Sequence, residues 1–561
     1  MIILKFLNKF RLNEILYISI FFLTVLKIFT KQLFFQKITS LEWTTVSHIP
    51  LVQFLINQTF LKNDIYFLGI IDSPNIFFSA IIAFFTISGF DIFTVLLAFQ
   101  LIYIYFGPLL VLIFCLTILE KFNETIEFPL NLFFFIKIFL FFGVLIISNL
   151  YYLDRLLTIL LSNYGIEFSS GSFLSPFGWE DPLNHRSIAP NTLAFLVGII
   201  FNIFWLKSKY SLSYLSLFLT TMIHPIIGIA NFLIGQIYEI FFYSLKRIKK
   251  TLLLFFIGVF LPITFSLIYF GVLNELSSKD FIEIYVNSRH PHHYLLSNLV
   301  GWGSLFWICI LFFNLIISFF SRLKSLKLLN FLCLLFVILS IIFQYLGTEI
   351  FYNLSISLLG PSRFTQYIFM ISLLNFVLTV SILIKDKFSN EASEKVEKHS
   401  KKVISKGKFT IICFCIFLFS LNLFIPNNLD KYKKFDDATV QWIKKNTDEN
   451  SLFFIPGEDN AQYGSIFSFN LRIFGKRSVW VDDAFPFNYS YVNEWSRRYE
   501  IYKNFYLNKN LYNFICEGLD KDVDYIITST SNKFKLSKEP IFENLYWTIF
   551  TLESLNENCK I

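Results

Sequence analysis

The densest group of chemically active side chains in the sequence is the block Arg289-His290-Pro291-His292-His293-Tyr294. It holds three of the seven histidines of the chain, beside an arginine and a tyrosine. Apolar runs of membrane-spanning length flank the block on both sides. A guanidinium and imidazoles at the edge of a bilayer can bind an anion, and lipid phosphate is the nearest one. The block predicts a phosphate site; the alternative is an interfacial loop with solvated histidines.

A second arginine can serve the same purpose. Arg363, which follows Gly360-Pro361-Ser362, also lies at a predicted membrane edge, and an arginine fork matches phosphate oxygens in bidentate fashion. A metal site is the rival interpretation, because His-x-His-His can supply ligands. No carboxylate near the block has the spacing of a zinc motif, so phosphate is favoured over metal.

Asp64, in Leu-Lys-Asn-Asp-Ile-Tyr, is the candidate general base, and it could also help to hold a divalent cation. The alternative is a helix cap or a turn residue. Glu42, Asp72 and Asp91 are competing carboxylates. Asp91 stands directly before an apolar run, which is typical of a helix cap.

Two further groups are candidates. His224 precedes Pro225 inside the apolar stretch 210–243, where an ionisable residue is a functional candidate and proline ends the preceding helix. The alternative there is a tight outer turn with a solvated histidine. A polar loop offers two carboxylates, an imidazole and a guanidinium for a sugar or a metal, although its Gly- and Pro-rich turns also need such residues. These four are Glu180, Asp181, His185 and Arg186.

Composition places these groups in a membrane protein. The 561 residues are 55% hydrophobic and only 16% charged, which is too little charge for a soluble domain of this length. Several apolar stretches reach the roughly 20 residues needed to cross a bilayer. The net charge of +8 does not indicate nucleic-acid binding, because the lysines and arginines cluster between apolar runs, as topology determinants do.

The basic clusters also predict the topology. With 74–89 lying in the membrane interface, the chain has about eleven spans, the N-terminus is cytoplasmic and every basic cluster faces the cytoplasm. Counting 74–89 as a span would place four basic clusters outside, against the positive-inside bias. The predicted spans are 14–30, 92–118, 132–149, 189–206, 210–223, 225–243, 251–271, 297–320, 328–346, 363–384 and 409–425.

Two domains follow from this pattern. Residues 1–425 form a transmembrane domain with a long first outer loop (31–91) and a charged cytoplasmic linker (385–408). Residues 426–561 have ordinary globular composition and form a small α/β domain on the outer face. We expect helices at 437–445 and 493–505, and strands at 451–455, 478–481, 524–528 and 546–551. This domain shows no nucleophile–base pair, which favours a recognition or structural module over a second catalytic site.

The order of these parts resembles the GT-C superfamily of glycosyltransferases: a first span, a long outer loop with an aspartate, many spans with short inner loops, and a soluble outer tail. Several short motifs are similar to an uncharacterised bacterial family of GT-C-like membrane proteins. They are Arg289–Tyr294, His224-Pro225, Pro361-Ser362-Arg363, Trp442–Thr447, Phe453–Pro456, Leu471–Arg477 and Glu494-Trp495.

The resemblance implies a bacterial inner-membrane enzyme. Such enzymes pass a sugar from a polyprenyl-phosphate or -diphosphate donor to a glycan or protein acceptor at the outer face. Asp64 would be the base or metal ligand, and Arg289, His290, His292, His293, Tyr294 and Arg363 would hold the donor phosphate. No cofactor is certain, and a divalent cation (Mg²⁺ or Mn²⁺) is the candidate. Many such enzymes carry paired acidic residues in the first loop, whereas here Asn63 precedes Asp64.

Two other classes compete with this interpretation. A flippase or transporter for a lipid-linked oligosaccharide would place ionisable residues near the bilayer midplane and show internal repeats. In this sequence the polar residues gather at one face, and the two halves show no repeat. A non-catalytic membrane scaffold of GT-C-like fold is the third class. It would have polar groups that point apart and no outer cavity near Asp64.

Overall fold

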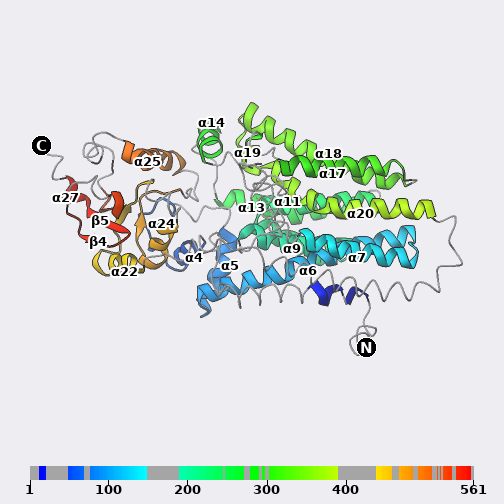
Figure 1. Cartoon of the computed structure of the whole chain (residues 1–561), viewed down its shortest axis with the longest axis horizontal. Coiled ribbons are helices and arrows are strands. Elements are labelled where there is room, and N and C mark those ends of the chain that lie inside the picture. Colours follow the sequence, from blue (N-terminus) through cyan, green and yellow to red (C-terminus); the bar gives the residue numbers. More distant parts are fainter. Residues whose placement is uncertain are drawn as a thin grey trace, which may run out of the picture. The chain divides into compact units, whose positions relative to one another are not determined.

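The computed structural model divides the chain into two compact units, whose described parts are drawn in Figure 1. The helical unit comprises Met1–Ser40, Leu97–Phe265 and His290–Pro426, and the α/β unit comprises Leu41–Leu96, Ser266–Arg289 and Asn427–Ile561. The structure describes residues 12–14, 16–20, 48–67, 76–147, 189–243, 247–270, 278–289, 294–296, 302–321, 323–388, 437–457, 466–483, 491–507, 515, 519, 522–532 and 539–556.

The helical unit consists of long apolar helices joined by short turns. Helix α6 (Ile92–Ile126) begins in the α/β unit and continues into the helical unit, and α13 (Leu261–Phe270) crosses the boundary in the other direction. The other described elements are α7 (Leu130–Ile147), α9 (Pro190–Leu206), α10 (Tyr210–Ile223), α11 (Pro225–Tyr243), α12 (Ile248–Phe255), η2 (Phe256–Phe260), α17 (Trp302–Ser318), α18 (Lys324–Tyr345), η4 (Leu346–Ile350), α19 (Leu354–Leu359), η5 (Pro361–Phe364) and α20 (Thr365–Phe388).

Four described helical stretches are long and apolar enough to cross a membrane, as expected of a helical membrane protein. The number of spans stays a prediction, because most of 14–30 and all of 409–425 lie outside the described residues. The 150–188 loop lies outside them as well, as does the linker 385–408 beyond Phe388. The four stretches are Ile92–Thr125, Pro225–Tyr243, Ile248–Phe265 and Lys324–Ile350.

Small residues let α10, α11 and η2 approach closely. As predicted, the chain breaks at His224, and α11 starts at Pro225. A Cβ atom built at Gly228 of α11 would lie 2.7 Å from the Cα atom of Thr221 in α10. The Thr221 hydroxyl donates a 2.6 Å hydrogen bond to the carbonyl oxygen of Gly258 in η2. Close backbone contact of this kind is typical of helices that associate in lipid.

Buried amides form a second kind of link between the helices. Asn202 of α9 donates a 2.9 Å hydrogen bond to the Oδ1 atom of Asn231 in α11. Asn330 of α18 donates to Thr379 of α20 (3.1 Å), and Asn314 of α17 donates to the backbone of α20 (3.0 Å). The NH₂ groups of these amides are paired inside the protein, because an unpaired donor facing hydrocarbon would cost free energy. The Oδ1 atoms of Asn314 and Asn330 have no hydrogen-bond partner among the described residues.

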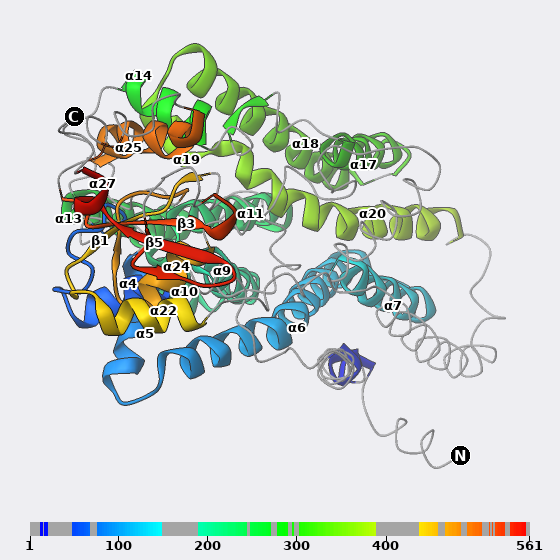
Figure 2. The same cartoon turned by 60° about the vertical axis from the view of Figure 1, so that its left-hand side comes forward.

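The α/β unit contains a five-stranded sheet in the order β2-β1-β3-β5-β4, drawn towards the viewer in Figure 2. Strands β2, β1 and β3 are parallel, and β5 and β4 are antiparallel to their neighbours. The four strands and two helices expected from the sequence are all present. They are β1 (Leu452–Phe454), β2 (Ser478–Val479), β3 (Tyr525–Ser529), β5 (Trp547–Thr551), α22 (Asp437–Asn446) and α25 (Val492–Asn504).

Each face of this sheet carries its own apolar core. Leu452 and Phe454 of β1 pack with Trp480, Trp495 and Ile526 on one face. The intervening Phe453 packs on the other face with Val479, Ile527 and Ile549, because side chains alternate along a strand. The remaining described elements of the unit are α4 (Ile49–Ile56), α5 (Ile76–Ile87), α14 (Ser278–Phe281), η3 (Ile282–Arg289), α24 (Ile466–Asn470), η7 (Leu471–Gly475), η9 (Phe505–Leu507), β4 (Phe542–Glu543) and α27 (Leu552–Asn556).

We expect Gly228→Ala to lower the melting temperature of the detergent-solubilised full chain, with a loss of roughly 1–3 kcal/mol from overpacking. The neighbouring Thr221 Cα is a backbone atom and cannot rotate away. Gly235→Ala is the matched control, because its Cβ would lie 3.1 Å from the movable side chain of Asn202. Thermal unfolding followed by size-exclusion chromatography measures both. Equal melting temperatures for the two variants would contradict this packing.

Candidate functional site

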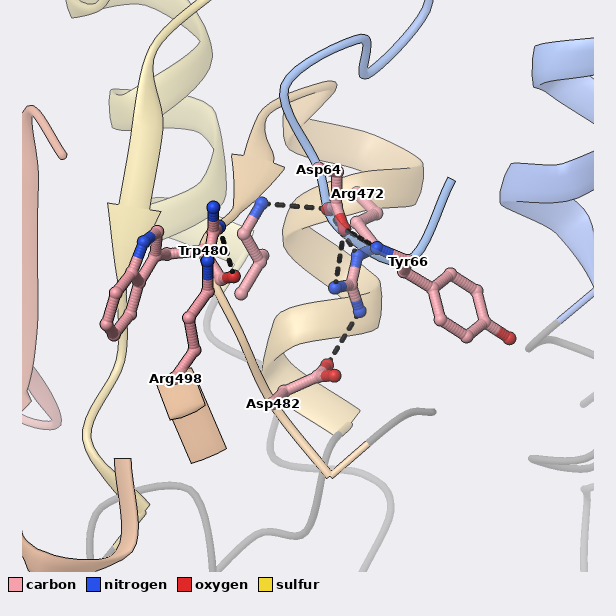
Figure 3. A network of polar contacts seen from close by, with 7 residues as sticks. Asp64, Tyr66, Arg472, Trp480, Asp482 and Arg498 are labelled. Atoms are coloured by element: carbon pink, nitrogen blue, oxygen red, sulfur yellow. Dashed lines mark hydrogen bonds and ion pairs between the residues drawn. The ribbon is translucent and has the colours of Figure 1, made fainter. Parts of the chain in front are cut away.

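Asp64 lies in a buried ion triad with Arg472 and Asp482, shown in Figure 3. The Nε and Nη2 atoms of Arg472 donate to the two carboxylate oxygens of Asp64, at 2.7 and 3.0 Å. Its Nη1 atom donates to Asp482 at 2.6 Å. The three side chains are 0–1% exposed, so one guanidinium faces two carboxylates away from water. The backbone amides of Tyr66 and Val479 also donate to Asp64.

Asp64 lies in a short turn that follows α4 in the α/β unit. The turn is closed by hydrogen bonds from the Asp64 amide to the Leu61 carbonyl and from the Phe67 amide to the Asp64 carbonyl, both 3.0 Å. Ile65 is buried in the same core as Trp480 and Trp495, and Asn63 donates to the carbonyl of Asn450 at 3.0 Å. The segment therefore forms part of the folded domain.

Arg472 and Asp482 come from the two ends of one supersecondary unit. Arg472 lies in η7, directly before β2, and Asp482 follows β2. The rings of Tyr66 and Phe469 each lie 5.1 Å from the guanidinium carbon of Arg472. Two aromatic rings thus cover the guanidinium where no carboxylate does, which favours a buried cation.

All four acceptor positions of the Asp64 carboxylate are filled. Oδ1 accepts from the Tyr66 amide (3.0 Å) and from Arg472, and Oδ2 accepts from the Val479 amide (2.8 Å) and from Arg472. A carboxylate offers about four lone-pair positions. To take a proton from a substrate, Asp64 would have to give up at least one of these hydrogen bonds.

The electrostatics of the triad keep the arginine charged. Burial lowers the pKa of Arg472, but the charges of Asp482 and Asp64, and the hydrogen bonds to them, outweigh burial and raise the pKa. The arrangement can hold two chain segments together. The Asp64 carboxylate, whose acceptor positions are all occupied, has none left over to bind a metal ion.

A second polar cluster fixes α25 against the chain that follows β2. Arg498 donates to the carbonyl of Trp480 (3.1 Å), and Tyr499 donates to Asp483 (3.0 Å). Glu494 accepts from Arg497 and Arg498, and the hydrogen bond from Arg497 is the largest cause that lowers the pKa of Glu494 to about 2. These charged residues of the C-terminal domain are therefore engaged in contacts within the domain.

The other candidate residues fall in several places. Arg289 ends η3 in the α/β unit, while Tyr294, His224 and Arg363 belong to the helical unit. Tyr294 is buried, and its carbonyl accepts from Gln344 at 3.3 Å. His224 is half-buried at the end of α10. Whether these residues gather around one ligand stays a prediction, because His290, His292, His293, Glu180, Asp181, His185 and Arg186 lie outside the described residues.

Asp91 is a helix cap, as predicted. Its carboxylate accepts from the Thr94 amide at 2.9 Å in the first turn of α6. Among the described residues, no group of three or more His, Cys, Asp or Glu side chains could hold a metal ion.

Comparison with models of protein families and with curated proteins finds no match to this sequence.

The partners of Asp64 could not be found from sequence spacing. Asp64 and Arg472 are 408 positions apart, and nothing near Asp64 indicates a distant guanidinium. One signal was available in the C-terminal domain: Arg472 and Asp482 stand on either side of the predicted strand 478–481, and a charge that becomes buried beside a strand needs a partner.

Replacing Arg472 with Met should destabilise the α/β unit by about 3–5 kcal/mol, because both aspartates would stay buried without their cation. Amide hydrogen exchange of peptides from residues 452–482 of the full chain, measured by mass spectrometry, reports this loss. Arg497→Met is the control, since Arg497 is 45% exposed and its ion pair contributes little. Unchanged exchange in the Arg472 variant would mean that the triad does not stabilise the domain.

His48 provides a pH-sensitive contact in the same unit. Its ring packs edge-on against Phe78 at 5.2 Å, and its buried Nδ1 atom has no hydrogen-bond partner among the described residues. Burial lowers the pKa of His48 from 6.5 to about 4. Between these values the unfolded chain binds the proton and the folded chain does not.

The free energy of unfolding of the α/β unit should therefore fall as the pH falls from about 6.5 to about 4. In His48→Gln, which stays neutral, this part of the pH dependence should disappear. Amide exchange of α4 and α5 peptides between these pH values, corrected for intrinsic exchange, measures the effect. An identical pH dependence in both proteins would exclude His48 as its source.

Proposed function

We propose that this chain is a GT-C-like membrane glycosyltransferase, which transfers a sugar from a polyprenyl-phosphate-type donor to a glycan or protein acceptor. In this proposal the reaction takes place at the outer face of a bacterial inner membrane. Arg289, Arg363, Tyr294 and the histidines between 290 and 293 hold the donor phosphate, where the arginines stabilise the charge that develops on the leaving group.

One observation carries the proposal: three distant parts of the chain share a core. Asp64 of the first loop pairs with Arg472 of the C-terminal domain, and Ile284 of η3 packs against the core that contains Trp480 and Trp495. Segments that share a buried core must lie on the same side of a membrane. This supports a topology in which the first loop, the approach to Arg289 and the tail all lie on one side of the membrane. The positive-inside bias makes that side the outer one.

The same constraint limits the number of spans between these segments. The number of membrane spans must be even between residues 97 and 265, and even again between 290 and 426, because the chain returns to the same side of the membrane each time. The predicted topology meets both conditions, with about six spans in the first interval and about four in the second. Treating 74–89 as a span would place Asp64 and the start of α6 on opposite sides of the membrane. Both belong to the α/β unit, and Phe93 of α6 stacks on Phe474, which argues against that span.

The role of Asp64 in this proposal depends on whether the triad opens. As a base, Asp64 would have to leave Arg472 when the donor and acceptor bind. With its four acceptor positions filled, the arrangement described here favours a structural role, in which Asp64 anchors the first loop to the tail. A donor phosphate held by Arg289 and Arg363 does not require Asp64 to move.

The filled carboxylate also favours a second candidate function, a non-catalytic membrane scaffold. In a scaffold, the first loop and the tail would form one recognition module, and Arg289 would belong to its surface. The two candidates differ in whether the chain binds a lipid-linked phosphate, so the first experiment tests binding and not turnover.

The purified chain in nanodiscs should bind polyprenyl phosphate, and Arg289→Ala combined with Arg363→Ala should weaken this binding at least about tenfold, since each arginine–phosphate pair contributes more than 1 kcal/mol. Native mass spectrometry measures the bound fraction. Arg497→Ala with Lys503→Ala, at two exposed side chains, is the control for lost positive charge. Absence of binding by the unaltered chain would overturn the transferase proposal and leave the scaffold.

Asp64→Asn separates the two roles of the aspartate. An amide cannot accept from both Arg472 nitrogens and the two backbone amides, so a structural role predicts faster exchange in residues 466–483 together with weaker donor turnover. A purely catalytic role predicts loss of sugar transfer with unchanged exchange. Full activity with unchanged exchange would contradict both roles.

A further inference from the structure

Helix α5 (Ile76–Ile87) has an apolar face that none of the described residues of the α/β unit covers. Phe78, Ile82 and Ala83 are buried, whereas Phe84 and Ile87 on the other face are 66% and 69% exposed. The helix contains no charged residue in its whole length. A surface helix of a soluble domain carries polar residues on its outer face, so this helix requires an apolar neighbour.

The neighbour is identified by the chain that follows. Gly89, with φ = +99°, turns the chain, Phe90 is 57% exposed, and α6 begins two residues later with the longest candidate membrane span. Figures 1 and 2 both show α5 joined to the start of α6 by this turn. Twelve residues of helix extend for only about 18 Å, which is too short to cross the roughly 30 Å of hydrocarbon.

The C-terminal domain contributes to the same surface. Phe474, at the end of η7, is 43% exposed and stacks on Phe93 in the first turn of α6, with ring centroids 5.9 Å apart and planes 5° apart. Phe474 therefore lies beside the point where the membrane span begins. Phe84, Phe85 and Phe90 form a continuous cluster next to the same turn, with centroids 5.7 and 6.5 Å apart.

An exposed cation stands beside this aromatic side chain. Gly475 is buried, and Lys476 follows it in the left-handed conformation (φ = 54°), so the short turn exposes Phe474 and Lys476 together. An aromatic ring with a lysine next to it is typical of protein that meets the headgroup region, because the ring enters the apolar boundary while the ammonium group reaches lipid phosphate.

We propose that the α/β unit docks on the bilayer through a lipid-binding surface made of Phe84, Phe85, Ile87, Phe90 and Phe474, with Lys476 at its edge against an anionic headgroup. A lipid surface fits better than a protein partner because the surface is continuous with the start of a membrane span. The C-terminal domain is then a peripheral membrane module and not a freely solvated tail. This inference does not depend on sugar transfer.

Photo-crosslinking tests the surface in the full chain. The benzophenone amino acid p-benzoylphenylalanine replaces Phe474, Ile87 or Leu545, one at a time, in nanodiscs of phosphatidylcholine and phosphatidylglycerol. Leu545 is the control: it is 80% exposed, but it lies in the β4–β5 turn at the edge of the sheet opposite β2. We expect positions 474 and 87 to gain the mass of one phospholipid on irradiation and position 545 to gain none.

The cation gives an independent readout. With the crosslinker at position 474, Lys476→Glu should lower the share of phosphatidylglycerol among the adducts, whereas Lys503→Glu, in α25, should leave it unchanged. Amide exchange of the unirradiated variants verifies that the domain is folded. A folded position-474 variant without lipid adducts would overturn the proposal. So would an adduct of twice the protein mass, which would assign the surface to a second copy of the chain.

Discussion

The structure of the α/β unit depends on one buried guanidinium. Removing an arginine from water costs several kcal/mol, and only close, well-aligned carboxylates offset that cost. Asp64 and Asp482 provide them, and the rings of Tyr66 and Phe469 cover the rest of the group. Since neither carboxylate alone satisfies all three donor nitrogens, the first loop and the C-terminal domain complete each other, and neither has a full set of partners in isolation.

This mutual dependence links folding to the membrane. Asp64 is synthesised before residues 97–426 and Arg472 after them, so the triad can close only when the intervening helices have returned the chain to the side of the membrane where Asp64 lies. Replacing a buried ion pair with apolar packing of equal volume is often neutral or stabilising, whereas removing one partner is strongly destabilising. We therefore regard the triad as a constraint on topology, in addition to the apolar cores on the two faces of the sheet.

Much of the fold could be predicted from local pattern. The strands β1, β2, β3 and β5 follow short runs of β-branched and aromatic residues between polar turns, and Pro225 marks the start of α11 because proline interrupts a helix. Strand β4 was missed, since two residues at a sheet edge carry almost no periodic signal. The fate of Asp64 could not be predicted: turn residue, cap and base all need an aspartate in a polar stretch, and only the position of Arg472 in space distinguishes them.

In the α/β unit, the charged residues of the triad are buried and paired, whereas several large apolar residues are exposed. The charged side chains of Asp64 and Arg472 lie at 0% exposure and pair with one another. The phenylalanines Phe84 and Phe474, by contrast, are exposed. In a domain between water and lipid, an exposed aromatic ring is therefore better evidence of an external ligand than a buried ion pair. The candidate ligand site of this chain is accordingly Arg289 with the segment after it, where the α/β unit ends and the helical unit resumes.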